Sequence, residues 1–168
     1  MSRDAGAGDS GESTRQADAD QAAADAARAR FRSDGLPCLP PDERIAPLLQ
    51  WDERVVAVHP AALLDRREPA HGVLAGSGVA GDLYVTSRRL VLVGRLRLTV
   101  ELAAIDDACL AGERLLLVLH DGHGVALDVA WPRLLRVEIS SARAAARAAS
   151  AGGGPGHSGA GNETVVIQ

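Results

Sequence analysis

The chain has 168 residues, with 22 acidic side chains against 18 basic ones, and a formal charge of −4 at neutral pH. Its length allows one ordinary domain with terminal extensions. Aromatic residues make up only 2% of it, too few for a base-stacking platform. Since the net charge is also negative, we do not expect nucleic acid as a partner.

The sequence lacks recognisable membrane and export signals. No apolar run reaches the roughly 18 residues that a spanning helix needs. The first four residues, Met-Ser-Arg-Asp, are not a basic segment followed by an apolar one. We therefore expect no transmembrane segment and a cytoplasmic protein, either free or attached peripherally to a membrane surface.

No catalytic or metal-binding constellation is recognisable. Cys38 and Cys109 stand alone without a CxxC partner, so neither a zinc site nor a disulfide scaffold is predicted. His120 and His123 flank an Asp-Gly pair and are interpreted as turn residues rather than metal ligands. No serine lies in a GxSxG turn, and the glycine-rich stretch 76–81 precedes a strand rather than a helix. These observations predict a protein without cofactor or metal and without enzymatic activity.

Both ends of the chain have compositions typical of flexible segments. Residues 1–34 contain mainly Ala, Asp, Gly, Ser, Arg and Gln and predict a disordered arm, in which 18–32 could form a transient helix. Residues 35–50 read as a proline-containing linker or short helix, and 150–168 as a disordered, glycine-rich tail. The apolar end of that tail, 165–167, either pairs with a partner's sheet edge or stays unstructured.

Between these ends the sequence predicts antiparallel strands. A first strand covers 54–59 and ends at Pro60, with 61–64 as a continuation past a kink, and a long loop follows over 65–82. Further strands are expected over 83–86, 90–94, 95–102, 114–120 and 125–130, with another strand or an irregular connection over 103–110. In the alternating segment 95–102 the predicted core-facing residues are Leu96, Leu98, Val100 and Leu102.

The period changes after Trp131-Pro132. Residues 133–149 predict a helix whose apolar stripe consists of Leu135, Ile139, Ala142, Ala146 and Ala149. The expected fold is thus mainly β with one C-terminal helix, an α+β class. Six or seven antiparallel strands would form a half-open barrel over 51–149, capped by the amphipathic helix.

One hairpin carries a resemblance to known families. Residues 81–94 read Gly-Asp-Leu-Tyr-Val-Thr-Ser-Arg-Arg-Leu-Val-Leu-Val-Gly and are followed by Val-Glu-Leu-Ala-Ala-Ile-Asp-Asp at 100–107. This run resembles the G-x-L-Y-x-T-x-R-R-L hairpin of GRAM and bacterial PH-like domains, and the resemblance extends over 51–149. It implies a PH-type fold and a non-enzymatic adaptor that binds a phosphoinositide, another anionic lipid or a protein peptide. A lipid site of that type would use basic residues near the first hairpin, here Arg66 and Arg67.

A second group of arginines follows within ten residues. Arg88, Arg89, Arg95 and Arg97 have no acidic residue between them and predict a local cationic patch. The alternative is a solvated strand face paired with Glu101, with Arg88 and Arg89 closing the hairpin. We therefore expect a module for protein–protein or anionic-lipid interaction. The alternative is a structural or regulatory subunit whose disordered N-terminal arm recognises the partner, and a pocket enzyme is least favoured.

Overall fold

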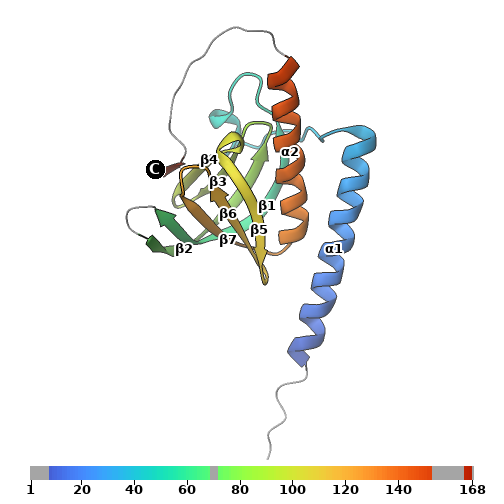
Figure 1. Cartoon of the computed structure of the whole chain (residues 1–168), viewed down its shortest axis with the longest axis vertical. Helices are drawn as coiled ribbons and strands as arrows, with labels where there is room; N and C mark the ends of the chain where they lie inside the picture. Colours follow the sequence, from blue (N-terminus) through green and yellow to red (C-terminus); the bar gives the residue numbers. More distant parts are fainter. Residues whose placement is uncertain (1–7, 69–71, 153–164, 168) are drawn as a thin grey trace, which may run out of the picture.

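The structure, a computed structural model, describes residues 8–68, 72–152 and 165–167, with side chains over 11–66 and 78–151. It contains one antiparallel sheet in the order β5-β6-β7-β1-β2-β3-β4-β8, and two long helices that lie side by side (Figure 1). The strands are β1 (Val55–Glu68), β2 (Gly72–Thr86), β3 (Arg89–Gly94), β4 (Arg97–Glu101), β5 (Ile105–Ala111), β6 (Arg114–Leu119), β7 (Gly124–Val129) and β8 (Val165–Ile167). The helices are α1 (Gly8–Asp34) and α2 (Pro132–Gly152), with short 3-10 turns η1 (Ala46–Leu48) and η2 (Leu102–Ala104).

Strand β1 joins two groups of strands. It pairs with β2 along most of its length and with β7 over 61–67, so β2–β4 lie on one side of it and β5–β7 on the other. The sheet does not close, since β5 lies at one end of the strand order and β8 at the other. The predicted class, mainly β with a capping C-terminal helix, is confirmed.

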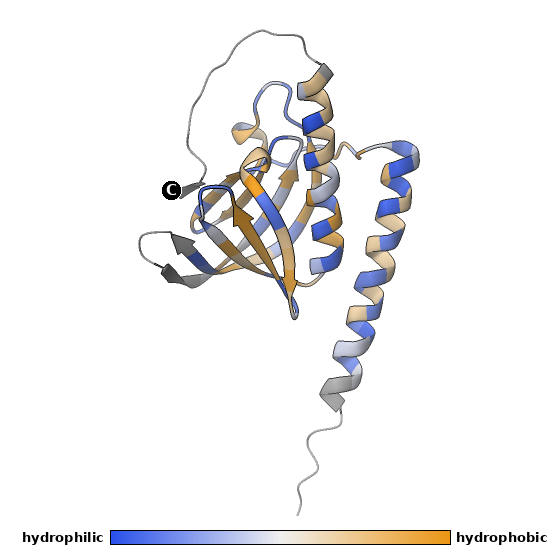
Figure 2. Cartoon of the chain, in the orientation of Figure 1, coloured by the Kyte–Doolittle hydropathy of each residue, from blue (hydrophilic) through white to orange (hydrophobic). Residues whose placement is uncertain are grey.

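The main core lies between the inner face of the sheet and α2. Its helical side consists of Leu135, Ile139 and Ala142, all fully buried, whereas the last two residues of the predicted stripe are not in the core: Ala146 is half-buried and Ala149 is exposed. Leu98, Val100 and Leu102 also point inward as predicted. Leu96 does not: it lies in the turn before β4, outside the pleat, and is 38% exposed. In Figure 2 the apolar colouring is concentrated on the strands, whereas polar residues cover much of both helices.

The long loop expected over 65–82 is instead part of a strand pair. β1 continues through Pro60 to Glu68, and β2 begins at Gly72. Pro60 is tolerated because only β2 pairs with it, the pairing with β7 starting one residue later. A register shift between Leu63 and Asp65, together with Gly78 at φ +60°, absorbs the irregular glycine-rich sequence.

The disordered arm predicted for 1–34 is wrong over Gly8–Asp34, which forms α1. Composition predicted disorder because alanine buries little surface, but α1 does not stand alone. Ala24 and Ala27 are buried against Val137 of α2, with Phe31 and Leu134 packed beside them. Tertiary packing thus supplies what the sequence of the arm lacks.

The end of the chain also differs from expectation. β8 pairs with β4 of its own sheet, Thr99 opposite Val166. Residues 165–167 are therefore neither unpaired with their own sheet nor unstructured, which were the two expectations for this segment. Among the described residues, no helix combines the length and hydrophobicity needed to cross a membrane.

Candidate functional site

The structure places the predicted arginines in different regions. Arg89 pairs with Glu101 at one end of β3, whereas Arg97 pairs with Val93 at the other. Arg66 lies farther along β1, opposite Val125 of β7. Arg67 is in the same strand, but its side chain lies outside the described residues. The candidates whose side chains the structure describes thus do not form one continuous cationic surface.

Arg89 is bound into the structure by a carboxylate. Its Nε and Nη2 donate to Glu53 Oε1 and Oε2, both at 2.9 Å, and Nη2 also donates to the Leu48 carbonyl at 2.6 Å. The Glu53 side chain is fully buried and also accepts from the Thr86 hydroxyl at 2.6 Å and the Gln50 amide at 3.0 Å. Burial by itself raises the pKa of Glu53, but the Arg89 fork and these other donors outweigh it and leave the pKa lowered.

The contacts around Glu53 hold the turn at residues 50–53, in which the Trp51 indole is exposed. Arg88 donates to Gln50 Oε1 at 2.8 Å and forms an ion pair with Asp52, so its guanidinium spans the turn. Trp51, between those two residues, is 97% exposed. Arg88 and Arg89 therefore hold the turn in place, close to the structural role that the sequence left open for them.

Arg95 and Arg97 differ from that pair. Arg95 is exposed and Arg97 half-buried, and neither has a hydrogen bond or ion pair within the described part of the chain. Arg44 lies at the same end of β3, where it binds Asp82 and donates to the Val93 carbonyl at 2.7 Å. Of the four predicted patch residues, only Arg95 and Arg97 have guanidinium groups without a hydrogen bond or ion pair among the described residues.

The other face of β1–β3 is covered by the segment before β1. Ile45 packs against Val55, Tyr84 and Val91 to form a second, smaller core. The Tyr84 hydroxyl donates to Asp42 at 2.6 Å, and burial, followed by this carboxylate, raises the pKa of Tyr84 to about 12. The segment 35–50, expected as a proline-containing linker or a short helix, contains the 3-10 turn η1 and packs onto the sheet through Ile45.

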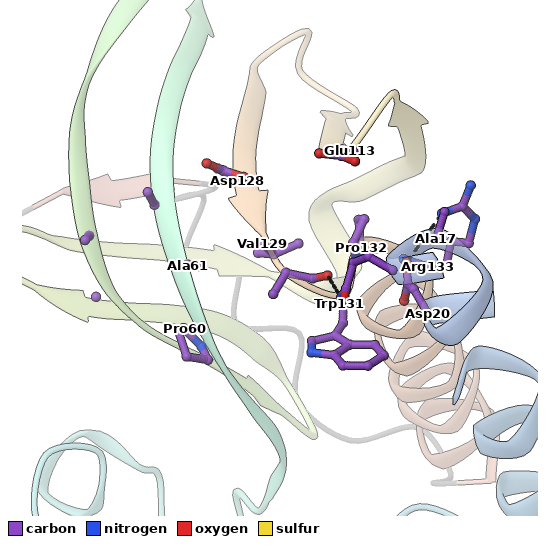
Figure 3. Close-up of a pocket in the computed structure, with 15 residues that line it drawn as sticks. Ala17, Asp20, Pro60, Ala61, Glu113, Asp128, Val129, Trp131, Pro132 and Arg133 are labelled. Carbon is purple, nitrogen blue, oxygen red and sulfur yellow. Dashed lines mark hydrogen bonds and ion pairs between the residues drawn. The ribbon is translucent and has the colours of Figure 1, made fainter. Parts of the chain in front are cut away.

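A cavity of about 750 Å³ opens where α1, the start of α2 and the sheet meet (Figure 3). The sheet contributes small residues from β1 and β2 together with the end of β7, and the half-buried Trp131 precedes α2. In the view of Figure 3 its indole lies between Pro60 and Arg133, with Asp128 and Glu113 toward the opposite side. The lining residues are Gln16, Ala17, Asp20, Pro60, Ala61, Ala62, Ala80, Gly81, Glu113, Asp128, Val129, Ala130, Trp131, Pro132 and Arg133.

Asp20 connects the cavity to the helix packing. Its carboxylate accepts from the backbone amides of Arg133 at 2.8 Å and Leu134 at 3.0 Å, and its Oδ2 lies 3.6 Å from Arg133 Nη1. It thus caps the first turn of α2 from a different helix. Gln16 adds a hydrogen bond of 3.1 Å to the Ala130 carbonyl. These contacts hold the α1 wall of the cavity against the rest of the domain.

Sequence reasoning missed this cavity, because its α1 wall was expected to be disordered. The available signal was the spacing of Ala24, Ala27 and Phe31, which places three apolar residues on one helix face. The sequence around Trp131 indicates only that a helix starts after it.

Three described histidines each lie beside a carboxylate. Nε2 of His59 lies 2.5 Å from Glu138 Oε2, a buried contact that ties β1 to α2. His120 lies 3.4 Å from Asp106, and His123 lies 3.0 Å from Asp121. Within the described ranges, no three His, Cys, Asp or Glu residues are grouped to hold a metal ion.

Comparison with known proteins adds no family. No family model and no curated protein matches the chain. Among solved structures, the chain is similar to the C-terminal domain of an unknown protein from Leishmania infantum, with 15% sequence identity and a TM-score of 0.41. The match covers 62% of this chain and 93% of the other. A likeness at this level carries no inference about function.

Proposed function

We propose that the protein is a non-enzymatic binding module that engages a protein partner at the cavity between α1, α2 and the sheet. The observation that carries the proposal is the composition of this cavity, whose lining combines small apolar residues and the Trp131 indole with two carboxylates, Asp128 and Glu113, on the opposite side (Figure 3). A concave site with an apolar floor and a few polar groups is the usual form of a recognition pocket. The hairpin that resembles GRAM and PH-like domains supports the same class of function.

The charge of the cavity favours a protein over an anionic lipid. A lipid phosphate would be repelled by Glu113 and Asp128. Arg88 and Arg89 are engaged in ion pairs within the domain, and Arg95 and Arg97 lie at the other end of β3. The lipid alternative therefore depends on Arg95 and Arg97, together with Arg66 and Arg67 of β1.

The N-terminal arm belongs to the same proposed site. Gln16, Ala17 and Asp20 of α1 line the cavity. A partner bound in the cavity would therefore contact both the N-terminal arm and the β domain. Loss of α1 would remove one wall, and partner binding is expected to require it.

Filling the cavity tests the proposal. Ala80 lines it and is exposed, so Ala80→Trp adds bulk there without overpacking the core, and Ala111→Trp at an exposed position of β5 is the matched control. Proteins captured from the native lysate are compared by quantitative mass spectrometry, and the candidate partner is then purified and titrated against each variant.

We expect a partner that binds the wild-type chain and the Ala111→Trp variant but does not bind the Ala80→Trp variant. An identical set of proteins on both variants would refute it. So would salt-sensitive binding to phosphatidylserine vesicles that is abolished by replacing Arg95 and Arg97 with Gln, since that result would support the lipid alternative.

A further inference from the structure

The cavity has an uncompensated negative charge. Asp20 and Arg133 neutralise each other, because the two side chains lie 3.6 Å apart and both carboxylate oxygens of Asp20 also accept backbone amides. Glu113 and Asp128 remain, and neither has an ion pair within the described residues. Both are exposed, so water can reach them until a ligand covers the site.

The apolar groups restrict what kind of cation fits. Trp131 offers a half-buried indole, and an indole face attracts a cation positioned over it. Pro60, Ala61 and Ala62 supply an aliphatic wall along β1. An ion without a hydrocarbon stem would leave this wall unused, whereas a long basic side chain would cover it and place its charge near the carboxylates.

We propose that this cavity receives an arginine side chain of the partner, an inference that rests on the proposed function. A guanidinium is planar, stacks on aromatic faces and donates in a fork to carboxylates, so it is suited to both kinds of group that line the cavity. The cavity, at about 750 Å³, also has room for the backbone on either side of such a residue.

One cation of the chain itself competes for this charge. Arg114 of β6 is directly opposite Asp128 in the register of β7. It forms no ion pair with Asp128 in the structure and is exposed, so it lowers the local negative potential without occupying the cavity. Its replacement by Gln is expected to strengthen binding of a cationic ligand.

The chain contains two tryptophans, which permits a direct optical test. Trp51→Phe removes the indole that is 97% exposed and leaves Trp131 as the single reporter. In this background the full chain is titrated with N-acetyl-arginine amide and with the neutral, nearly isosteric N-acetyl-citrulline amide, while Trp131 emission is recorded. A saturable change in the millimolar range is expected for the arginine derivative, and at least tenfold weaker binding for citrulline.

Charge-matched variants separate the cavity from the overall field. Glu113→Gln with Asp128→Asn is expected to weaken arginine binding at least tenfold. The control, Glu43→Gln with Asp34→Asn, changes the net charge equally at exposed positions that do not line the cavity and is expected to leave binding within twofold. Arg114→Gln is expected to strengthen it.

Equal binding of arginine and citrulline derivatives, equal weakening by both pairs of substitutions, or no saturable change would each overturn the inference. The outcome is distinguishable from failure of the proposed function. If Ala80→Trp abolishes partner binding but Trp131 does not respond to the arginine derivative, the cavity is a partner site with another specificity. If Ala80→Trp leaves partner binding intact, the proposed function itself fails.

Discussion

Arg89 offers the sharpest test of how this domain is held together. Arg89→Met keeps the aliphatic stem but removes both bonds to Glu53 and the bond to the Leu48 carbonyl. The Glu53 side chain is fully buried and that of Arg89 is 17% exposed, so the variant leaves a charge inside the protein without its counter-ion. Removing one partner of such a pair costs about 3–5 kcal/mol.

We expect the lower end of that range, about 3 kcal/mol, because Glu53 keeps the Thr86 hydroxyl and the Gln50 amide as donors. For a chain of this size the loss corresponds to a Tm lower by roughly 6–12 °C. Urea unfolding followed by circular dichroism measures it. Arg88→Met is the matched control, since it breaks a half-exposed ion pair with Asp52 and is expected to cost less than about 1 kcal/mol.

The pH dependence has a definite sign. In the wild type the pKa of Glu53 is lowered, so its stabilising effect is complete above the ordinary carboxyl pKa and is lost as the pH falls through the lowered value. In Arg89→Met the main counter-ion is missing and burial dominates, which favours the protonated acid. The difference in unfolding free energy between the two proteins should therefore be largest at neutral pH and shrink toward pH 4.

A second substitution separates unpaired charge from lost packing. Glu53→Gln added to Arg89→Met removes the buried charge and is expected to recover about half of the lost stability. The reasoning is refuted if Arg89→Met is no worse than Arg88→Met, or if its deficit does not depend on pH and is not reduced by Glu53→Gln.

Three other outcomes follow from contacts elsewhere in the structure. Tyr84 is the only tyrosine, so absorbance at 295 nm should show one phenol titrating near pH 12, and stability should fall as the pH rises from 10 through that value. Gly81→Ala should cost about 2 kcal/mol in urea unfolding, because its Cβ would lie 2.4 Å from a backbone oxygen of β3, whereas Gly11→Ala has open space and should be neutral or stabilising. Asp20→Ala should cost about 1 kcal/mol and speed amide exchange in α1, and Asp25→Ala, exposed on the same helix, should leave that exchange unchanged.

Local sequence patterns predicted the structure correctly where all the residues that form the pattern lie close together in the chain. The hairpin of β2 and β3 has apolar runs joined by a two-residue turn, and Val85 pairs with Leu90 as that pattern requires. The period of α2 placed Leu135 and Ile139 in the core correctly. In both cases the information lies within about twenty consecutive residues.

Local patterns failed where a distant segment supplies the stabilising contact. The arm before β1 forms a helix that packs against α2, through Ala24 and Ala27 against Val137. The glycine-rich stretch became part of β2 because β1 provides its hydrogen-bond partners. Neither contact can be predicted from the composition of the segment that it stabilises.

The hairpin motif and the proposed binding site have different physical roles. Tyr84, Thr86 and Arg89, which carry much of the resemblance, each have partners inside the protein: Asp42 for the first and Glu53 for the other two. They hold the chain before β1 against the sheet, and a side chain already engaged in this way is poorly placed to read a ligand.

The cavity is assembled differently, from single residues of α1, β1, β2, β7 and the turns beside them. No short motif can encode such a site, since its members come together only after the sheet and both helices have formed. Changes at Tyr84, Thr86 and Arg89 of the hairpin motif should therefore lower stability, and any loss of binding should follow from unfolding. Changes at exposed cavity positions such as Asp128 should alter binding at unchanged stability. Measuring both quantities on both sets of variants would show whether architecture and recognition are separate in this fold.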